Sequence, residues 1–136
     1  MAKILIVDDD ISVRALLRSY LESDGHQVDE AVDGKQASKR YRENIFNIVI
    51  TDIFMPEQDG LELIMELKEC LPSVKIIAIS GGGHGMEAQL VLKLTRFLGS
   101  VQQLKKPFTR IQVLEAVYLS DKMNSSFADE HSVQSI

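Results

Sequence analysis

Acidic side chains follow two of the short apolar runs of this sequence, at the point where each run ends. Asp8 and Asp9 follow Lys3–Val7, and Asp52 follows Ile48–Thr51. Carboxylates brought close together repel one another, and a hard divalent cation with oxygen ligands removes that conflict. A carboxylate can also attack phosphorus as a nucleophile and form an acyl phosphate. The pattern therefore predicts phosphoryl chemistry assisted by Mg²⁺, with Mn²⁺ as an alternative cation.

Ser80 and Lys106 extend this pattern to the ends of two further runs. Ser80 follows Lys75–Ile79, and Lys106 comes shortly after Val101–Leu104. A hydroxyl group and an ammonium group can bind phosphoryl oxygens, and phosphoryl transfer depends mainly on such positioning and charge neutralisation. Taken singly, Ser80 reads more simply as a strand-end cap, Lys106 as a solvated group, and Asp10 as a helix cap. The prediction depends on the placement of Ser80 and Lys106 at the same edge as the carboxylates that follow the other strands.

The five apolar runs alternate with amphipathic stretches and predict a parallel β-sheet covered by helices. Lys3–Val7, Ile48–Thr51 and Lys75–Ile79 consist mainly of β-branched residues and Leu, as in strands buried on both faces. His26–Ala31 is more polar and is expected at an edge, and Val101–Leu104 precedes an amphipathic stretch. Helices are expected within Val13–Leu21, Lys35–Asn44, Leu61–Leu71, Leu90–Leu98 and Ile111–Tyr118. The result is a three-layer (βα)5 α/β fold, in which ligands bind at the carboxyl ends of the strands.

Local signals mark where helices begin and end. Pro72 should end one helix, and Gly99 should cap another. Thr109 and Gln112 have the spacing of a capping box at the start of the last helix. Asp121–Ile136 loses the periodicity and is expected as a polar tail, at most a fraying extension of that helix. We therefore expect one domain over residues 1–120, a tail over 121–136, and no output domain.

Composition narrows the function classes. A chain of 136 residues with 45% hydrophobic and 26% charged residues suits a single globular domain with its own core. No apolar run exceeds four residues, too few for a membrane span or a signal peptide. The single cysteine, Cys70, allows no internal disulfide and favours the cytoplasm. The absence of a His/Cys cluster argues against zinc, and a net charge of −5 argues against general nucleic-acid binding.

Four motifs resemble the receiver domain of bacterial two-component response regulators, in its stand-alone, single-domain form. The motifs are ILIVDDD (Ile4–Asp10), VITDIFMPEQDG (Val49–Gly60), IIAISG (Ile76–Gly81) and LKKPF (Leu104–Phe108). They come in the family's order and span nearly all of Lys3–Leu119. The resemblance implies a flavodoxin-like fold with the strand order 2-1-3-4-5.

The resemblance also implies a role for each site residue. Asp52 would be the phosphoacceptor, and Ser80 and Lys106 would take the family's switch and lysine positions. Mg²⁺ would be bound directly by Asp9, Asp52 and the backbone carbonyl of Phe54, and through water by Asp8. The bond from Lys106 to Pro107 is typically cis in the family.

The implied function is a phosphorylation switch. The chain would accept a phosphoryl group from a sensor histidine kinase or a His-phosphotransfer protein and signal by protein–protein contact, without a DNA-binding domain or a membrane. It would be a phosphoacceptor protein rather than an enzyme, apart from its self-catalysed phosphorylation and dephosphorylation. The fourth helix, fifth strand and fifth helix would form the signalling surface, and a homodimer would use the same surface.

The sequence departs from the family at the switch. Gln103 stands three residues before the lysine, where the family usually has Tyr or Phe. The interval from Ser80 to Lys106 is also about four residues, or one helical turn, longer than usual. We therefore expect the conformational change to pass through the glycine-rich loop 81–85 and the start of the fourth helix rather than through an aromatic side chain.

Two alternative functions remain open at this point. A degenerate receiver would act as a binding module without phosphorylation, although Asp52 and Lys106 are both present. A haloacid-dehalogenase-like phosphatase is suggested by the spacing of Asp8 and Asp10, although that family usually has a longer chain and a later acidic cluster. Turnover separates the three functions. A phosphatase hydrolyses substrate repeatedly, a receiver traps about one phosphoryl group per chain, and a degenerate module traps none.

Overall fold

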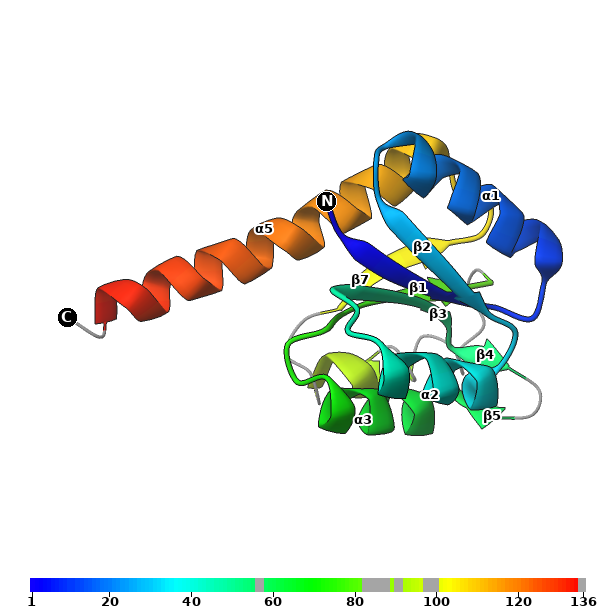
Figure 1. Cartoon of the computed structure of the whole chain (residues 1–136), viewed down its shortest axis with the longest axis horizontal. Helices are drawn as coiled ribbons and strands as arrows, with labels where there is room; N and C mark the ends of the chain where they lie inside the picture. The colour runs from blue at the N-terminus through cyan, green and yellow to red at the C-terminus, as the bar shows by residue number, and fades with distance from the viewer. Residues whose placement is uncertain (56–57, 82–88, 90–91, 97–100, 135–136) are drawn as a thin grey trace.

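A five-stranded parallel sheet forms the centre of the protein (Figure 1). A computed structural model describes residues 1–55, 58–81, 89, 92–96 and 101–134. The sheet strands are β1 (Lys3–Val7), β2 (Gln27–Ala31), β3 (Ile48–Asp52), β6 (Lys75–Ser80) and β7 (Gln102–Lys105). Their order is β2-β1-β3-β6-β7, which confirms the flavodoxin-like order and the position of the polar strand at an edge.

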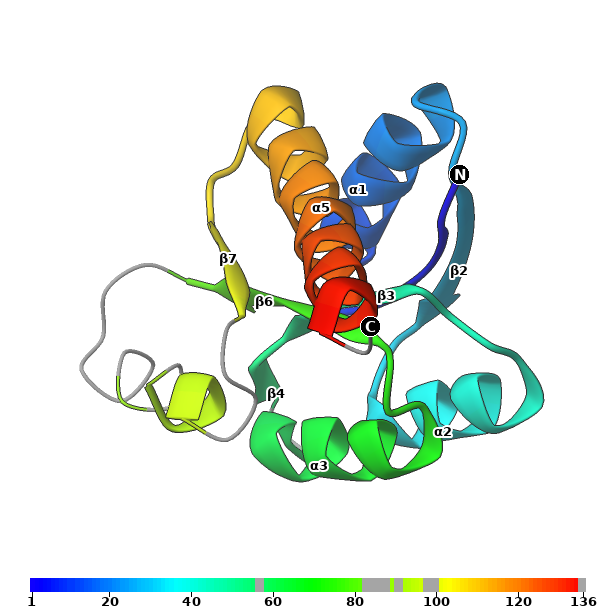
Figure 2. The same cartoon turned by 90° about the vertical axis from the view of Figure 1, so that its left-hand side faces the viewer.

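Helices cover both faces of the sheet (Figure 2). α1 (Ile11–Ser23) and α5 (Arg110–Gln134) lie on one face, and α2 (Gly34–Glu43) and α3 (Gly60–Cys70) lie on the other. Residues 92–96, inside the predicted fourth helix, are also helical. Among the described residues, no helix has both the length and the hydrophobicity needed to cross a membrane.

The core consists of two apolar layers because side chains of a strand alternate between the two faces of the sheet. In β1, Ile4 and Ile6 pack in the layer under α1 and α5, whereas Leu5 and Val7 pack in the layer under α2 and α3. All four side chains are fully buried. This two-sided burial explains why β1 is an unbroken apolar run and makes it the fixed base from which the following residues extend.

Two of the expected helix caps are formed, at the starts of α1 and α5. The Asp10 carboxylate accepts a hydrogen bond of 2.8 Å from the backbone N–H of Ser12 at the start of α1. Before α5, Thr109 N–H donates to the Gln112 side chain at 2.9 Å, and Gln112 N–H donates to Thr109 Oγ1 at 3.2 Å. This reciprocal pair is the predicted capping box. The predicted cap at Gly99 lies outside the described residues.

Arginines cover the outer edge of β2. Since Ala31 O accepts from the Asp8 N–H directly after β1, the carbonyls of Val28 and Glu30 point to the opposite, outer edge of the strand. Arg18 of α1 donates to Val28 O at 2.9 Å, and Arg40 of α2 donates to Glu30 O at 3.3 Å. The edge is thus hydrogen-bonded from both helical layers.

Two features go beyond the predicted elements. A short antiparallel ribbon of β4 (Phe54–Met55) and β5 (Gln58–Asp59) follows Asp52, in a segment for which the sequence predicts no strand. α5 also continues through Gln134 and projects past the sheet in Figure 1, whereas residues 121–136 were expected to form a polar tail or, at most, a fraying extension of that helix. No glycine or proline occurs after Pro107, so no residue of those types interrupts this helix.

Ile77 tests the assignment of the core. Its side chain is fully buried in the inner strand β6, so Ile77→Ala should lower the free energy of unfolding by about 2–5 kcal/mol. Ile111 on α5 is 74% exposed, and Ile111→Ala should change it by less than about 0.5 kcal/mol. Urea unfolding of both variants measures the difference. Equal effects would contradict the described packing.

Tyr41 on α2 predicts a loss of stability at alkaline pH. Its side chain is buried, and burial raises the pKa of the phenol to about 12. Because the unfolded phenol titrates near pH 10, the unfolded chain loses its proton first and stability falls between about pH 10 and 12. Tyr41→Phe should remove roughly 2 kcal/mol of that decline. Urea unfolding from pH 7 to 12 measures it, and parallel profiles for the two proteins would show the prediction to be wrong.

Candidate functional site

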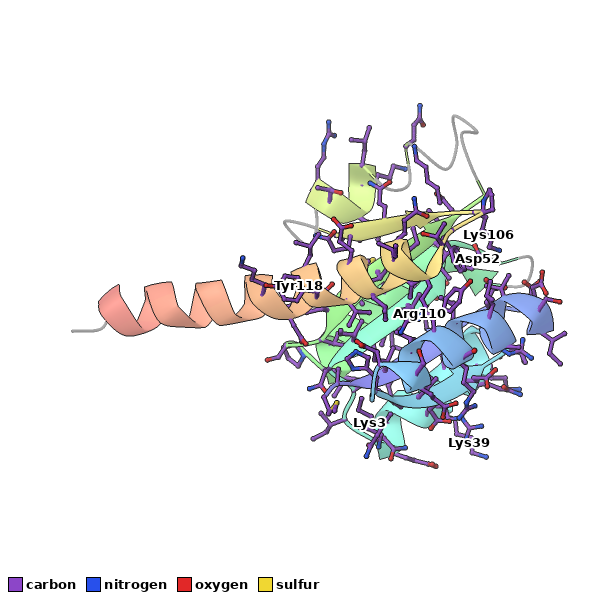
Figure 3. The ribbon with its side chains drawn as sticks, turned by 90° about the horizontal axis from the view of Figure 1, so that it is seen from above. Lys3, Lys39, Asp52, Lys106, Arg110 and Tyr118 are labelled. Atoms are coloured by element: carbon purple, nitrogen blue, oxygen red, sulfur yellow. The ribbon has the colours of Figure 1, made fainter. Side chains whose placement is uncertain are left out.

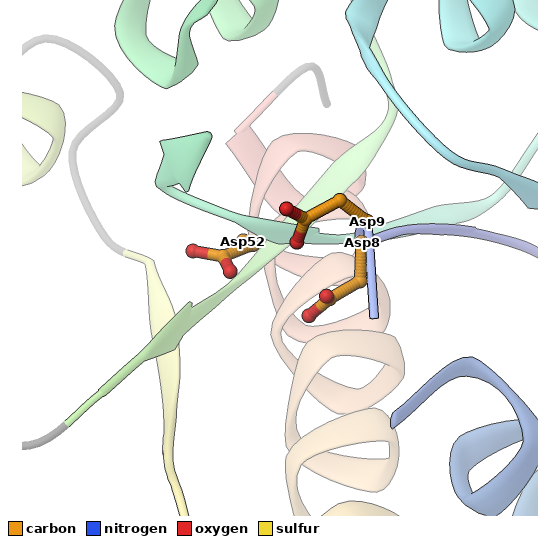
Figure 4. Close-up of side chains that lie close together, drawn as sticks. All are labelled: Asp8, Asp9 and Asp52. Atoms are coloured by element: carbon orange, nitrogen blue, oxygen red, sulfur yellow. The ribbon is translucent and has the colours of Figure 1, made fainter. Parts of the chain in front are cut away.

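The carboxyl ends of β1 and β3 bring three carboxylates together. Val7 of β1 is in register with Thr51 of β3, so the residues that follow Val7 lie beside Asp52. One carboxylate oxygen each from Asp8, Asp9 and Asp52 lies within 4.8 Å of the others (Figure 4). The structure therefore assembles the acidic cluster that the strand-end pattern predicts.

Lys106 joins this cluster from the end of β7 (Figure 3). Its Nζ lies 3.4 Å from Asp8 Oδ2 and 3.5 Å from Asp52 Oδ2. The backbone N–H of Lys106 donates to Ser80 O at 2.8 Å, which fixes the end of β7 against β6. The bond to Pro107 is cis, as the resemblance implied. Lys106 is thus an ammonium group placed between two of the three carboxylates.

Burial sets the electrostatics of this cluster. Asp8 is fully buried, and this burial raises the pKa of its carboxyl group, although the Asp10 backbone N–H and Lys106 oppose the rise. Burial also disfavours the charged form of Lys106, but the attraction of Asp8 and Asp52 outweighs it and raises the pKa of that ammonium group. Lys106 is therefore firmly charged, while the Asp8 carboxylate is costly to keep ionised.

The donor set fits a hard divalent cation. Its members are carboxylate oxygens from Asp8, Asp9 and Asp52, which Mg²⁺ prefers over nitrogen or sulfur. The ammonium of Lys106 carries one positive charge against three carboxylates, so a divalent cation would balance the remainder. Phe54, whose carbonyl was expected as a further ligand, begins β4 two residues after Asp52.

Ser80 lies at the same edge of the sheet. It is the last residue of β6 and is 6% exposed. The preceding residue, Ile79, is in register with Asp52, so Ser80 extends just past Asp52 on the neighbouring strand. The structure thus brings the hydroxyl-bearing residue to the edge where the acidic cluster lies.

Gln103 is exposed on β7, where the resemblance leads one to expect an aromatic residue. It borders a recess of about 370 Å³ between β7 and α5, together with Gln112 and Glu115 of α5. Of the glycine-rich loop 81–85 only Gly81 lies within the described residues. The expected coupling through that loop therefore stays a prediction.

Arg14 and Glu30 belong to the surroundings of the site and were missed by the sequence analysis. Arg14 donates to the Asp8 carbonyl at 2.7 Å and to the Glu30 carboxylate at 3.0 Å. A signal was present, because Arg14 shares the buried face of α1 with Leu17 and Leu21. An arginine in an apolar stripe indicates a buried partner. Glu30 lies on the edge strand, to which no site residue had been assigned.

Known proteins with similar sequences include two chemotaxis proteins CheY. The protein of Listeria monocytogenes is 39% identical over 119 residues, which cover 86% of this chain and 96% of the relative. The protein of Thermotoga maritima is 34% identical over 116 residues, which cover 85% and 93%. The similarity thus extends over nearly the whole length of these relatives.

Solved structures show the same fold. Chemotaxis protein CheY4 of Vibrio cholerae aligns with a TM-score of 0.77 and 26% identity, over 88% of this chain and 98% of its own. NtrX of Brucella abortus aligns with a TM-score of 0.86 and 25% identity over 97% of this chain, which spans 29% of that protein. The sequence model of the response regulator receiver domain matches residues 4–118. With this match, the strand order and the assembled acidic edge, the chain belongs to the response regulator receiver domain family.

Proposed function

We propose that this chain is a phosphorylation-dependent signalling switch whose phosphoacceptor is Asp52. The observation that carries the proposal is the contact of one ammonium group, Lys106, with two carboxylates at the edge where parallel strands end. Such an edge is the usual ligand site of an open α/β sheet. Membership of the receiver domain family and the similarity to chemotaxis proteins CheY support a signalling role.

The proposed reaction transfers a phosphoryl group from a phosphohistidine of a histidine kinase or His-phosphotransfer protein. A carboxylate oxygen of Asp52 attacks phosphorus, the P–N bond breaks, and its electron pair stays on the imidazole nitrogen. Lys106 and the Ser80 hydroxyl bind phosphoryl oxygens and hold the group in place. Asp9, Asp52, the Phe54 carbonyl and, through water, Asp8 would hold Mg²⁺, which when bound neutralises charge on the phosphoryl oxygens. Water later hydrolyses the acyl phosphate and resets the switch.

The proposal includes where and with what the switch acts. A kinase or phosphotransfer protein of the cytoplasm would supply the phosphoryl group, and a downstream protein would read it from the surface formed by the fourth helix, β7 and α5. A homodimer would form through the same surface. Residues 1–120 would be the receiver domain, with the rest of α5 as an appendage. The chain would thus be a phosphoacceptor protein rather than an enzyme with an external substrate.

Intact mass after incubation with acetyl phosphate and Mg²⁺ tests the acceptor. The wild-type chain should gain one phosphoryl group, and Asp52→Asn should gain none because its amide is not a nucleophile toward phosphorus. Omitting Mg²⁺ should suppress the wild-type adduct. Repeated hydrolysis without a trapped group would favour a phosphatase. No adduct, together with no Mg²⁺-dependent binding of beryllofluoride, would favour a degenerate binding module.

Asp8→Asn tests whether the ionised Asp8 carboxylate lowers the stability of the fold while it contributes to Mg²⁺ binding. Because the pKa of Asp8 is raised in the folded state, its ionised form destabilises the fold at neutral pH, and that cost disappears as pH falls through the raised pKa. In metal-free buffer at pH 7 the neutral variant should therefore melt higher by a few degrees, since 1 kcal/mol corresponds to roughly 4 °C in a domain of this size. Added Mg²⁺ should raise the melting temperature of wild type more than that of the variant. A lower melting temperature for metal-free Asp8→Asn would contradict the prediction.

A further inference from the structure

Arg14 is a buried cation bonded to the peptide group that joins the two acidic residues after β1. It is 9% exposed. Its Nη1 donates to the carbonyl oxygen of Asp8 at 2.7 Å, and its Nε donates to Glu30 at 3.0 Å. A buried arginine is costly unless its charge and its N–H groups have partners, and these contacts supply both. The bond to Asp8 is therefore a strong, directed constraint on the backbone.

The position of that bond matters because of the geometry of the peptide unit. The Asp8 carbonyl lies in the rigid plane of the peptide that connects Asp8 to Asp9. Rotating this plane changes ψ of Asp8 and φ of Asp9, so it redirects the two carboxylates relative to each other. The bond from Arg14 opposes this rotation, while Asp8 N–H is held by Ala31 O at 3.2 Å. One side chain thus controls the relative direction of two proposed ligands.

We propose that Arg14 is a positioning residue of the cation site, holding the Asp8–Asp9 peptide so that both carboxylates face Asp52. This inference rests on the proposed function, in which these carboxylates hold Mg²⁺. Glu30 acts behind Arg14, because its carboxylate accepts from the same guanidinium and keeps it in place. The edge strand β2 therefore takes part in the site, although it contributes no ligand.

Arg18 provides a matched control. It also pairs with Glu30 and lies on the same helix, but its other two guanidinium nitrogens pair with Glu22 and donate to Val28 O at 2.9 Å, and neither contacts Asp8. Arg14→Met and Arg18→Met each remove one positive charge and one partner of Glu30. Arg18→Met also removes the contacts with Glu22 and Val28, but only Arg14→Met removes the bond to the Asp8 carbonyl, so weaker Mg²⁺ binding in Arg14→Met alone points to that bond.

The first experiment measures Mg²⁺ affinity by titration calorimetry on variants whose folding is verified by circular dichroism. Arg14→Met should weaken binding about 10–100-fold, the usual effect of removing a group that orients a metal ligand. The Mg²⁺ affinity of Arg14→Lys should lie between those of wild type and Arg14→Met. An ammonium group can reach one acceptor but lacks the planar guanidinium that bonds to both Asp8 and Glu30. The Mg²⁺ affinity of Arg18→Met should stay within about twofold of the wild-type affinity, because Arg18 makes no bond to Asp8. Equal affinity for wild type and Arg14→Met would overturn the inference.

The second experiment needs neither metal nor phosphoryl donor. The N–H of Asp10 donates to Asp8 Oδ1 at 2.8 Å, so a loosened peptide plane should disturb this bond. Amide hydrogen exchange at Asp10 should be faster in Arg14→Met, or in Arg14→Lys if the former does not fold, and unchanged in Arg18→Met. Unchanged exchange in the folded Arg14 variant would overturn the inference. A wild-type chain that binds no Mg²⁺ would instead refute the proposed function, and the exchange result would still decide whether Arg14 holds the peptide.

Discussion

Repulsion among carboxylates at one edge of the sheet is the constraint on which the arrangement of this protein depends. Parallel strands end at the same edge, so the residues that follow β1 and β3 are brought together by the fold itself. Asp8 is fully buried and Asp52 nearly so, and little water is available to screen them. Lys106 counters the repulsion from β7, and the hydrogen bond from its backbone to Ser80 determines where that ammonium group can lie. The order of the strands thus determines which charged side chains lie next to one another.

The same constraint couples the stability of the fold to occupancy of the site. A buried carboxyl with a raised pKa is a local cost, and a ligand that relieves it stabilises the folded state over the unfolded state. The cost is contained because the apolar layers on both sides of β1 fix the backbone up to Val7. The free-energy cost of the buried carboxylate is therefore not relieved by local unfolding at the end of β1. It can instead be relieved when a ligand binds.

The fold and the clustering of the three carboxylates could be predicted from the sequence because both depend on local patterns. Apolar runs such as Ile76–Ile79 mark buried strands, and the carboxyl end of each strand gives the position of the site residue. Arg14 was missed because its role depends on a carbonyl and on Glu30 sixteen residues away, neither of which has a sequence signature. The β4–β5 ribbon was missed because two-residue strands have no periodicity. The continuation of α5 was underestimated because the apolar stripe ends near Ser120 while the backbone remains free of helix breakers.

The arginines on the outer edge of β2 have a consequence for how the molecule behaves at high concentration. An unpaired edge strand is a template on which another chain can add a strand, and this is a common route to aggregation. Here the outward carbonyls of Val28 and Glu30 already accept from Arg18 and Arg40, one arginine from each helical layer. An incoming strand would have to displace both guanidinium groups and then lie beside the acidic side chains of Asp29 and Glu30. The edge strand is thereby protected against polymerisation of the sheet by the same kind of side chain that supports the site.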